Sequence, residues 1–230
     1  RTTLLGGALT VIRNNARHRL DNLALFELGT VYLPDPESDT LVTEDRHLLL
    51  AACGDLRPRH WQSKPETADV YFLKGVLERL AHYLRRDLTI AGAQLPFLHP
   101  GRSATLRCND VDLGYLGELH PDLCEEWELP PRVVVAEVNL SRWMAQPALA
   151  WELRPIPRFP AIERDVAFEL PDTIPAIEAE QLIRREGGQW LESVTLFDVY
   201  RGKQVAEGNR SLAYTLRYRA PDRTLTDEAV

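Results

Sequence analysis

The clearest periodic pattern in the chain is helical and lies between residues 70 and 85. Apolar side chains recur there at spacings of three and four residues, which places them on one side of a helix. They are Leu73, Val76, Leu77, Leu80, Ala81 and Leu84. The pattern therefore predicts a helix that packs on a core through this stripe, and that leaves Lys74, Glu78, Arg79 and Arg85 to solvent or a partner.

The remainder of residues 1–150 reads as short strands separated by few helices. Helices are expected over 4–15 and 121–127, although the pair Gly6-Gly7 weakens the first. Strands are expected over 23–32, 46–53, 103–107, 111–118 and 133–139. Several strands between few helices favour a largely antiparallel sheet over a doubly wound parallel one.

A proline-rich stretch separates this region from the rest of the chain. Trp151–Pro160 contains three prolines in its last six residues, which disfavours a helix and predicts an extended connector. We therefore expect one domain over 1–150, a connector over 151–160 and a second domain over 161–230.

The second domain shows a strand over 165–170, a helix that begins at Pro175, and two alternating strands over 191–200 and 209–219. A helix start near Thr226 follows. The order strand, helix, strand, strand, helix predicts a ferredoxin-like split βαβ fold that is truncated before its last helix and strand. The start at Arg1 instead of Met also indicates a fragment of a longer protein. The predicted fold class is thus α+β throughout.

Composition limits the class of protein. Apolar residues make up 44% and charged residues 27% of the 230, as in ordinary soluble domains. No apolar run approaches the roughly 18 residues that cross a bilayer, and no signal peptide opens the chain. The three cysteines, Cys53, Cys108 and Cys124, have no metal-ligand spacing and are expected to be buried thiols in a reducing cytoplasm.

The formal net charge of −7 argues against nucleic-acid binding over the whole surface, but not against a local site. Between residues 198 and 223 the balance reverses. Six cations in this stretch face only Asp198, Glu207 and Asp222; they are Arg201, Lys203, Arg210, Arg217, Arg219 and Arg223.

Nothing in the chain indicates a catalytic site. P-loop, G-x-G-x-x-G, H-E-x-x-H and G-x-S-x-G motifs are all missing from the sequence. The six histidines are scattered, and none pairs with another at metal-ligand spacing. His99 and His120 each precede a proline, and we interpret them as imidazoles that stabilise turns.

A binding site is better supported than a catalytic one. In the strand over 191–200, alternation places Asp198 and Tyr200 on one side. On the open face of a ferredoxin-like sheet, a phenol ring can stack on a base and a carboxylate can accept two hydrogen bonds from guanine. Leu196 has the same parity, so a β-bulge could intervene.

From the residues alone, several interpretations of this site stay open. Asp198 could bond turn amides near Gly202, and Tyr200 could cap the edge of the core. RNA binding, a small-ligand regulatory module and a subunit contact are then about equally supported.

Short motifs along the whole chain resemble the β subunit of bacterial phenylalanine–tRNA ligase in order and spacing. In the first domain they are Arg1–Leu5, Asn14-Asn15, Leu25–Gly29, Leu73–Gly75, Leu98–Gly101 and Gly114–Pro121. In the second they are Pro160–Asp165, Phe197-Asp-Val-Tyr-Arg-Gly202 and Arg223–Asp227.

This resemblance implies a class II synthetase-like sheet domain followed by a ferredoxin-like anticodon-binding domain. The first domain would be non-catalytic, because its strand Leu25–Leu28 and its turn Leu116–Cys124 lack the arginines that hold ATP in active class II domains. ATP and Mg²⁺ would be bound outside this fragment, in an α subunit of an α2β2 assembly.

The resemblance also assigns the site. Asp198 and Tyr200 match the residues that meet the first anticodon base of tRNA(Phe), a guanine. The neighbouring Arg201, Arg217 and Arg219 are expected to contact RNA phosphates. The alternative is a protein–protein scaffold whose ferredoxin-like module does not bind RNA.

Overall fold

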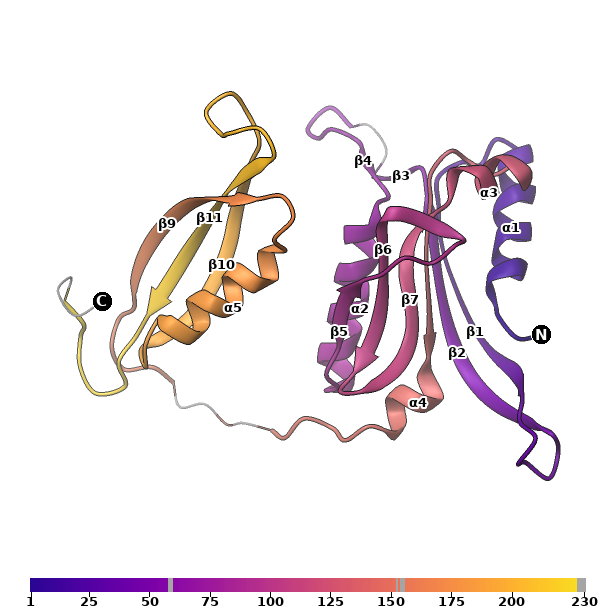
Figure 1. The fold of residues 1–230 in the computed structure, drawn as a ribbon, viewed down its shortest axis with the longest axis horizontal. Coiled ribbons are helices and arrows are strands. Elements are labelled where there is room, and N and C mark those ends of the chain that lie inside the picture. The colour runs from indigo at the N-terminus through magenta and orange to yellow at the C-terminus, as the bar shows by residue number, and fades with distance from the viewer. Residues whose placement is uncertain (58–59, 152, 154–155, 227–230) are drawn as a thin grey trace. The chain divides into compact units, whose positions relative to one another are not determined.

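The computed structural model describes the chain except for residues 58–59, 152, 154–155 and 227–230. It divides into two compact units, Arg1–Trp151 and Glu152–Val230, each with its own core (Figure 1). The limits of 1–150, 151–160 and 161–230 expected from the sequence stay a prediction. In the described part of the chain, no helix has the length and the apolar run needed to cross a bilayer.

The first unit is built on a six-stranded sheet in the order β1-β2-β8-β7-β6-β5, in which every neighbouring pair is antiparallel. The strands are β1 (Leu23–Pro34), β2 (Val42–Cys53), β5 (Thr89–Gly92), β6 (Leu98–Cys108), β7 (Val111–Leu119) and β8 (Val133–Asn139). The antiparallel sheet expected from the sequence is therefore confirmed. A small separate hairpin pairs β3 (Asp55–Arg57) with β4 (Glu66–Thr67).

Helices cover both faces of this sheet, so its central strand β8 is buried along its whole length. On one face, α2 (Val70–Leu84) and α4 (Leu140–Ala145) pack on Val134, Ala136 and Val138. On the other, α1 (Leu5–Arg17) and α3 (Pro121–Glu126) pack on Val133 and Val135 (Figure 1). This explains why β8 reads as an unbroken apolar run and not as an alternating one.

The helix α2 forms where the periodic pattern predicts it. The side chain of Asp69 accepts a hydrogen bond from the backbone N–H of Phe72 at 2.9 Å and caps its first turn. Arg85, with φ of +52°, ends it in the left-handed conformation. Leu73, Leu77 and Ala81 are buried as expected, but the expectation for Val76 was wrong. Its side chain is 37% exposed because it lies at the margin of the stripe.

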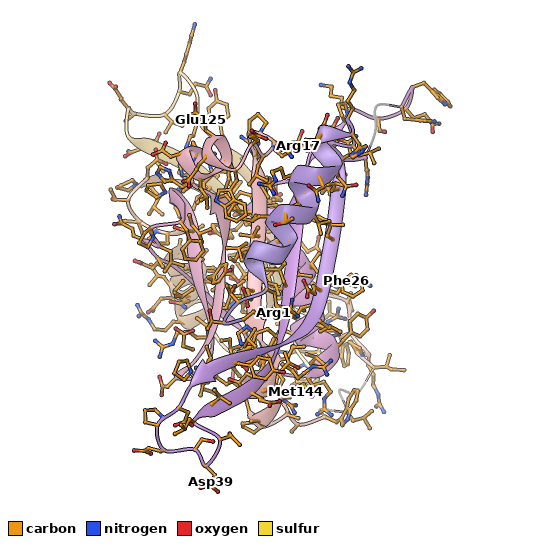
Figure 2. The ribbon with its side chains drawn as sticks, turned by 90° about the vertical axis from the view of Figure 1, so that its right-hand side faces the viewer. Arg1, Arg17, Phe26, Asp39, Glu125 and Met144 are labelled. Atoms are coloured by element: carbon orange, nitrogen blue, oxygen red, sulfur yellow. The ribbon has the colours of Figure 1, made fainter. Side chains whose placement is uncertain are left out.

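The helix α1 packs on one face of the sheet, with Arg1 before its start and Arg17 at its end (Figure 2). Arg1 pairs with Glu27 at 2.7 Å, and Arg17 pairs with Glu128 at 2.5 Å. Both pairs are exposed, so each stabilises the fold only slightly.

A buried carboxylate on β8 holds the residues before α1. One oxygen of Glu137 accepts from the backbone N–H of Leu4 at 3.1 Å and from Nδ1 of His47 at 2.8 Å. The other accepts from the hydroxyls of Thr3 at 2.5 Å and Tyr115 at 3.1 Å. Glu137 is only 4% exposed, and these four donors replace the water that an ionised carboxylate requires.

Burial and the neighbouring charge of Glu137 raise the pKa of the Tyr115 phenol well above its ordinary value. The phenol therefore stays protonated and remains a donor to this carboxylate at any physiological pH.

The second unit holds a three-stranded antiparallel sheet in the order β10-β11-β9, with one helix on one face. Its elements are β9 (Ile162–Pro171), α5 (Ala176–Glu186), β10 (Leu191–Tyr200) and β11 (Asn209–Tyr218). Ala179 of α5 packs on Val194, Leu212, Tyr214 and Leu216. The hydroxyl of Tyr214 also donates to the carbonyl of Ala176 at 3.0 Å. This arrangement confirms the ferredoxin-like fold.

Of two further expectations for this unit, the burial of Leu182 was wrong, and the helix near Thr226 reaches into residues that the structure does not describe. Leu182, expected in the buried stripe of α5, is 49% exposed because it lines an open apolar cavity with Phe168 and Leu170 of β9. The helix start near Thr226 cannot be followed, since residues 227–230 lie outside the described part; Pro221–Thr226 are not helical.

Gly114 of β7 should not tolerate a side chain. Its φ is +138°, and a Cβ there would overlap the carbonyl oxygen of Glu137 on the neighbouring strand. Because that oxygen belongs to the backbone of a buried strand, Gly114→Ala should lower the free energy of unfolding by about 2 kcal/mol or more. Chemical denaturation of the chain measures this loss.

Gly75 offers the matched control for that substitution. It lies inside α2, and a Cβ there meets nothing within 4 Å. Gly75→Ala should therefore raise the free energy of unfolding by about 0.5–1 kcal/mol. Equal effects of the two substitutions would contradict the close approach of β7 and β8 at Gly114.

Glu137 should be replaceable by glutamine but not by leucine. Glutamine keeps one oxygen for Leu4 and His47, and its amide can donate to the hydroxyl oxygens of Thr3 and Tyr115. Glu137→Gln should cost about 1 kcal/mol, whereas Glu137→Leu leaves the donors unsatisfied and should cost about 3–5 kcal/mol. Similar unfolding midpoints for the two variants would show that the carboxylate does not hold the N-terminal residues.

Candidate nucleic-acid interface

An extra residue in β10 decides which of its side chains face away from α5. Leu196 pairs with Tyr214 and Asp198 pairs with Ala213, so Phe197 has no partner on β11. Residues directly opposite in a sheet point to the same face. Tyr214 points into the core beneath α5, and hence Leu196 lies on the helix side and Asp198 on the open side.

This irregularity is the bulge that the parity of Leu196 raised as a possibility, and the structure confirms it. In a regular strand Leu196 and Asp198 would share one face. With the bulge, Leu196 and Val199 point to the helix side while Asp198 and Tyr200 turn to the open face.

The open face around these two side chains is uncrowded. The residues opposite them on β11 are Ala213 and Ser211, whose short side chains cannot cover them. Tyr200 is 42% exposed and therefore does not simply cap the core. Among the residues that the structure describes, the carboxylate of Asp198 has no hydrogen bond or ion pair. It therefore does not bond the turn amides near Gly202.

The three predicted phosphate-binding arginines are not brought together at this place. Arg201, beside Tyr200, directs Nε and Nη2 to Asp172 at 3.2 and 2.9 Å, which leaves Nη1 unused. Arg217 lies four residues along β11 from Ala213, roughly 13 Å away, on the same face. Its Nε is bonded to Glu192 at 2.9 Å.

The side chain of Arg219 is hydrogen-bonded to other residues of the second unit. It bonds Glu192 at 3.1 Å and the carbonyl of Phe159 at 2.7 Å, and its side chain is 17% exposed. It therefore holds the chain before β9 against the end of the sheet. Sequence reasoning could not identify this, because its partners lie 27 and 60 residues away.

Acidic side chains gather on the β9 side of the open face. Along β9, the residues paired with the open-face positions of β11 include Glu163, Asp165 and Glu169. Asp165 accepts from Thr215 at 2.7 Å, and Glu163 pairs with Arg217 at 3.5 Å. A polyanion is repelled from this side, so the uncrowded surface for it is β10 and the turn after it.

Asp172 is a component of the site that sequence reasoning missed. Its carboxylate pairs with Arg201 at 2.9 Å and with Arg210 at 3.6 Å. It thereby fixes the turn that follows Tyr200. A single acid 29 residues before Arg201 gives no recognisable signal in the sequence.

The first unit is hollowed beside Glu137, next to the residues that precede α1. A cavity of about 220 Å³ lies there, lined by Thr3, His47, Tyr115 and Arg142, together with the acids Asp112 and Glu137. Ligand pockets usually measure about 300–1,000 Å³. The small size and the two carboxylates of this cavity do not fit a nucleoside triphosphate.

Other reactive groups of the first unit have structural roles. Nδ1 of His99 accepts from the backbone N–H of Gly101 at 3.1 Å, and Nδ1 of His120 accepts from that of Asp122 at 3.3 Å. The interpretation of both as turn-stabilising is confirmed. The three cysteines are free and buried, and burial raises the pKa of each thiol. Within the described residues, no cluster of three metal-ligating side chains occurs.

Two family models match the two units of this chain. The family model of the phenylalanyl tRNA synthetase beta chain CLM domain matches residues 1–140. The model of the ferredoxin-fold anticodon binding domain matches residues 157–230. The crystal structure of pyrrolysyl-tRNA synthetase from Desulfitobacterium hafniense has a TM-score of 0.48 and 18% identity, over 63% of this chain and 48% of that one.

Two curated relatives are each a phenylalanine--tRNA ligase beta subunit. That of Symbiobacterium thermophilum is 47% identical over 99% of this chain and 26% of its own length. That of Moorella thermoacetica is 44% identical over 100% of this chain and 28% of its own length. The chain thus spans about a quarter of the relatives it matches. Because the first model covers more than half of it, the chain belongs to the phenylalanyl-tRNA synthetase beta chain family.

Proposed function

We propose that this chain is the part of a phenylalanine–tRNA ligase β subunit that reads the tRNA anticodon and supports assembly with the α subunit, without catalysing a reaction itself. The observation that carries the proposal is the joint exposure of Asp198 and Tyr200 on the open face of the second unit, two residues apart on one strand.

The two side chains provide complementary means of reading a base. The phenol of Tyr200 can stack on an unstacked base, which is worth about 1–3 kcal/mol. The unpaired carboxylate of Asp198 can accept hydrogen bonds from N1–H and N2–H₂ of guanine together. Adenine, cytosine and uracil lack that pair of donors, so Asp198 would select guanine, the first base of the tRNA(Phe) anticodon.

Phosphate contacts are expected beside Tyr200. Arg201 keeps one nitrogen of its guanidinium unused, and its side chain is 56% exposed. Arg217 is also partly exposed and lies farther along the same face, whereas Arg219 would have to leave its bonds with Glu192 and Phe159 to reach a phosphate. Arg201 therefore ranks first among the three, and Arg219 last.

The first unit is proposed as the contact with the α subunit. The strand β1, at one edge of its sheet, exposes large apolar side chains: Phe26 is 72%, Leu28 51% and Tyr32 44% exposed. Such side chains are typical of surfaces that a partner covers. ATP and Mg²⁺ would then be bound by that partner, in a cytoplasmic α2β2 enzyme that joins phenylalanine to its tRNA.

Tyr200→Ala in the complete enzyme should raise KM for tRNA, because it removes the stacking surface. The loss should be about fivefold to a hundredfold, the equivalent of 1–3 kcal/mol. ATP–pyrophosphate exchange with phenylalanine should not change, since that reaction does not involve the anticodon. Tyr200→Phe, which keeps the ring, serves as the control. An equal loss in the exchange reaction would refute the assignment.

Asp198→Ala should relax the choice of the first anticodon base more than it weakens binding in general. The measurement compares kcat/KM for tRNA(Phe) and for a transcript with that guanine replaced by adenine. Glu207→Ala, which removes an exposed acid from the turn between β10 and β11, is the matched control. If the base change costs the Asp198 variant as much as it costs the wild type, Asp198 does not read the base.

The salt dependence of tRNA binding distinguishes the proposed function from the scaffold alternative. Phosphate contacts predict that the affinity for tRNA falls steeply as salt is added, whereas a module that only contacts protein binds no tRNA at any salt concentration.

A further inference from the structure

The ring of Tyr200 occupies the space that a side chain at residue 202 would need, which explains the glycine at this position. A Cβ built on Gly202 would lie 2.5 Å from Cζ and 3.0 Å from Cε1 of Tyr200, and still closer to its hydroxyl oxygen. The hydroxyl end of the ring therefore rests against the backbone of the turn, in space that only glycine leaves open.

The turn that receives the ring is itself held in place. Asp172 binds Arg201 immediately before Gly202, and its backbone N–H donates to the carbonyl of Gly208 at 2.9 Å. Within the turn, the N–H of Val205 donates to the carbonyl of Gly202 at 3.0 Å. Gly202 is thus a fixed support for the ring.

We propose that Gly202 is a positioning residue for anticodon recognition: it lets the ring of Tyr200 fold back onto the turn and so sets the stacking surface beside Asp198 before RNA arrives. This inference rests on the proposed function of Tyr200. A side chain that is already held loses less conformational entropy on binding, which favours affinity.

Gly202→Ala separates positioning from folding. The atoms that the new methyl group meets belong to the far end of a half-exposed side chain, and not to backbone. The ring can therefore swing away at little cost while the fold survives. The variant should unfold at the wild-type midpoint and yet carry a displaced Tyr200.

The first measurement needs no RNA. Nitration of Tyr200 by tetranitromethane, followed by peptide mass mapping of the full β chain in its enzyme, reports how accessible the ring is. Gly202→Ala should increase the nitration rate of Tyr200, whereas Gln204→Ala, an exposed substitution in the same turn, should not. An unchanged rate in Gly202→Ala overturns the geometric part of the proposal.

The second measurement is a double-mutant cycle on KM for tRNA(Phe). Gly202→Ala should raise KM at least about threefold, a part of the loss expected when the whole stacking surface is removed. In a Tyr200→Ala background the same substitution should add nothing, because the ring through which it acts is gone.

The outcomes are distinct. A KM for Gly202→Ala that equals the wild-type value, or an effect that adds fully to that of Tyr200→Ala, overturns the positioning role. If Tyr200→Ala itself leaves KM unchanged, the proposed function fails and the positioning role in recognition fails with it. The nitration rates then still show whether Gly202 holds the ring in the free protein.

Discussion

The extra residue at Phe197 is the constraint on which the recognition surface depends. The helix side of β10 supplies Leu191 and Val194 to the core beneath α5, and strict alternation would place Asp198 on the same side as Leu196. The bulge resolves this conflict within one strand. Bulges commonly redirect side chains at functional sites, and the same feature here leaves the register of the neighbouring strand pair intact.

In the first unit, by contrast, the charged side chain of Glu137 stabilises the fold. A carboxylate buried at the centre of a sheet is costly unless its lone pairs are satisfied, and Glu137 meets four donors from three separate parts of the chain. Its negative charge lies beside the small cavity of this unit, where a triphosphate would require cations. The same residue thus stabilises the fold and disfavours nucleotide binding.

The sequence predicted those features that arise from local patterns. The stripe of α2, the apolar run of β8 and the alternation of β11 each identify an element by its own residues. The short strand β5 and the helix α4 were missed, since β5 exists by pairing with β6 and α4 by burying Trp143. In the candidate site, parity predicted that Asp198 and Tyr200 share one face of β10, and the strand pairing confirms this. The bonds of Arg219 with Glu192 and Phe159, and the ion pairs of Asp172, join residues far apart in sequence. No local sequence pattern indicates such long-range bonds.

Charge and geometry together restrict how RNA can approach the second unit. The acidic side chains along β9 repel phosphates from one side of the open face, and the ion pairs of Arg217 and Arg219 reduce the positive charge at the far end of β10. The end of β10 near Tyr200 combines an unpaired carboxylate, an accessible ring and the partly free Arg201. On the proposed function, an anticodon base that enters there would meet one acceptor pair and one stacking surface at once, so discrimination would follow from position and not from overall charge.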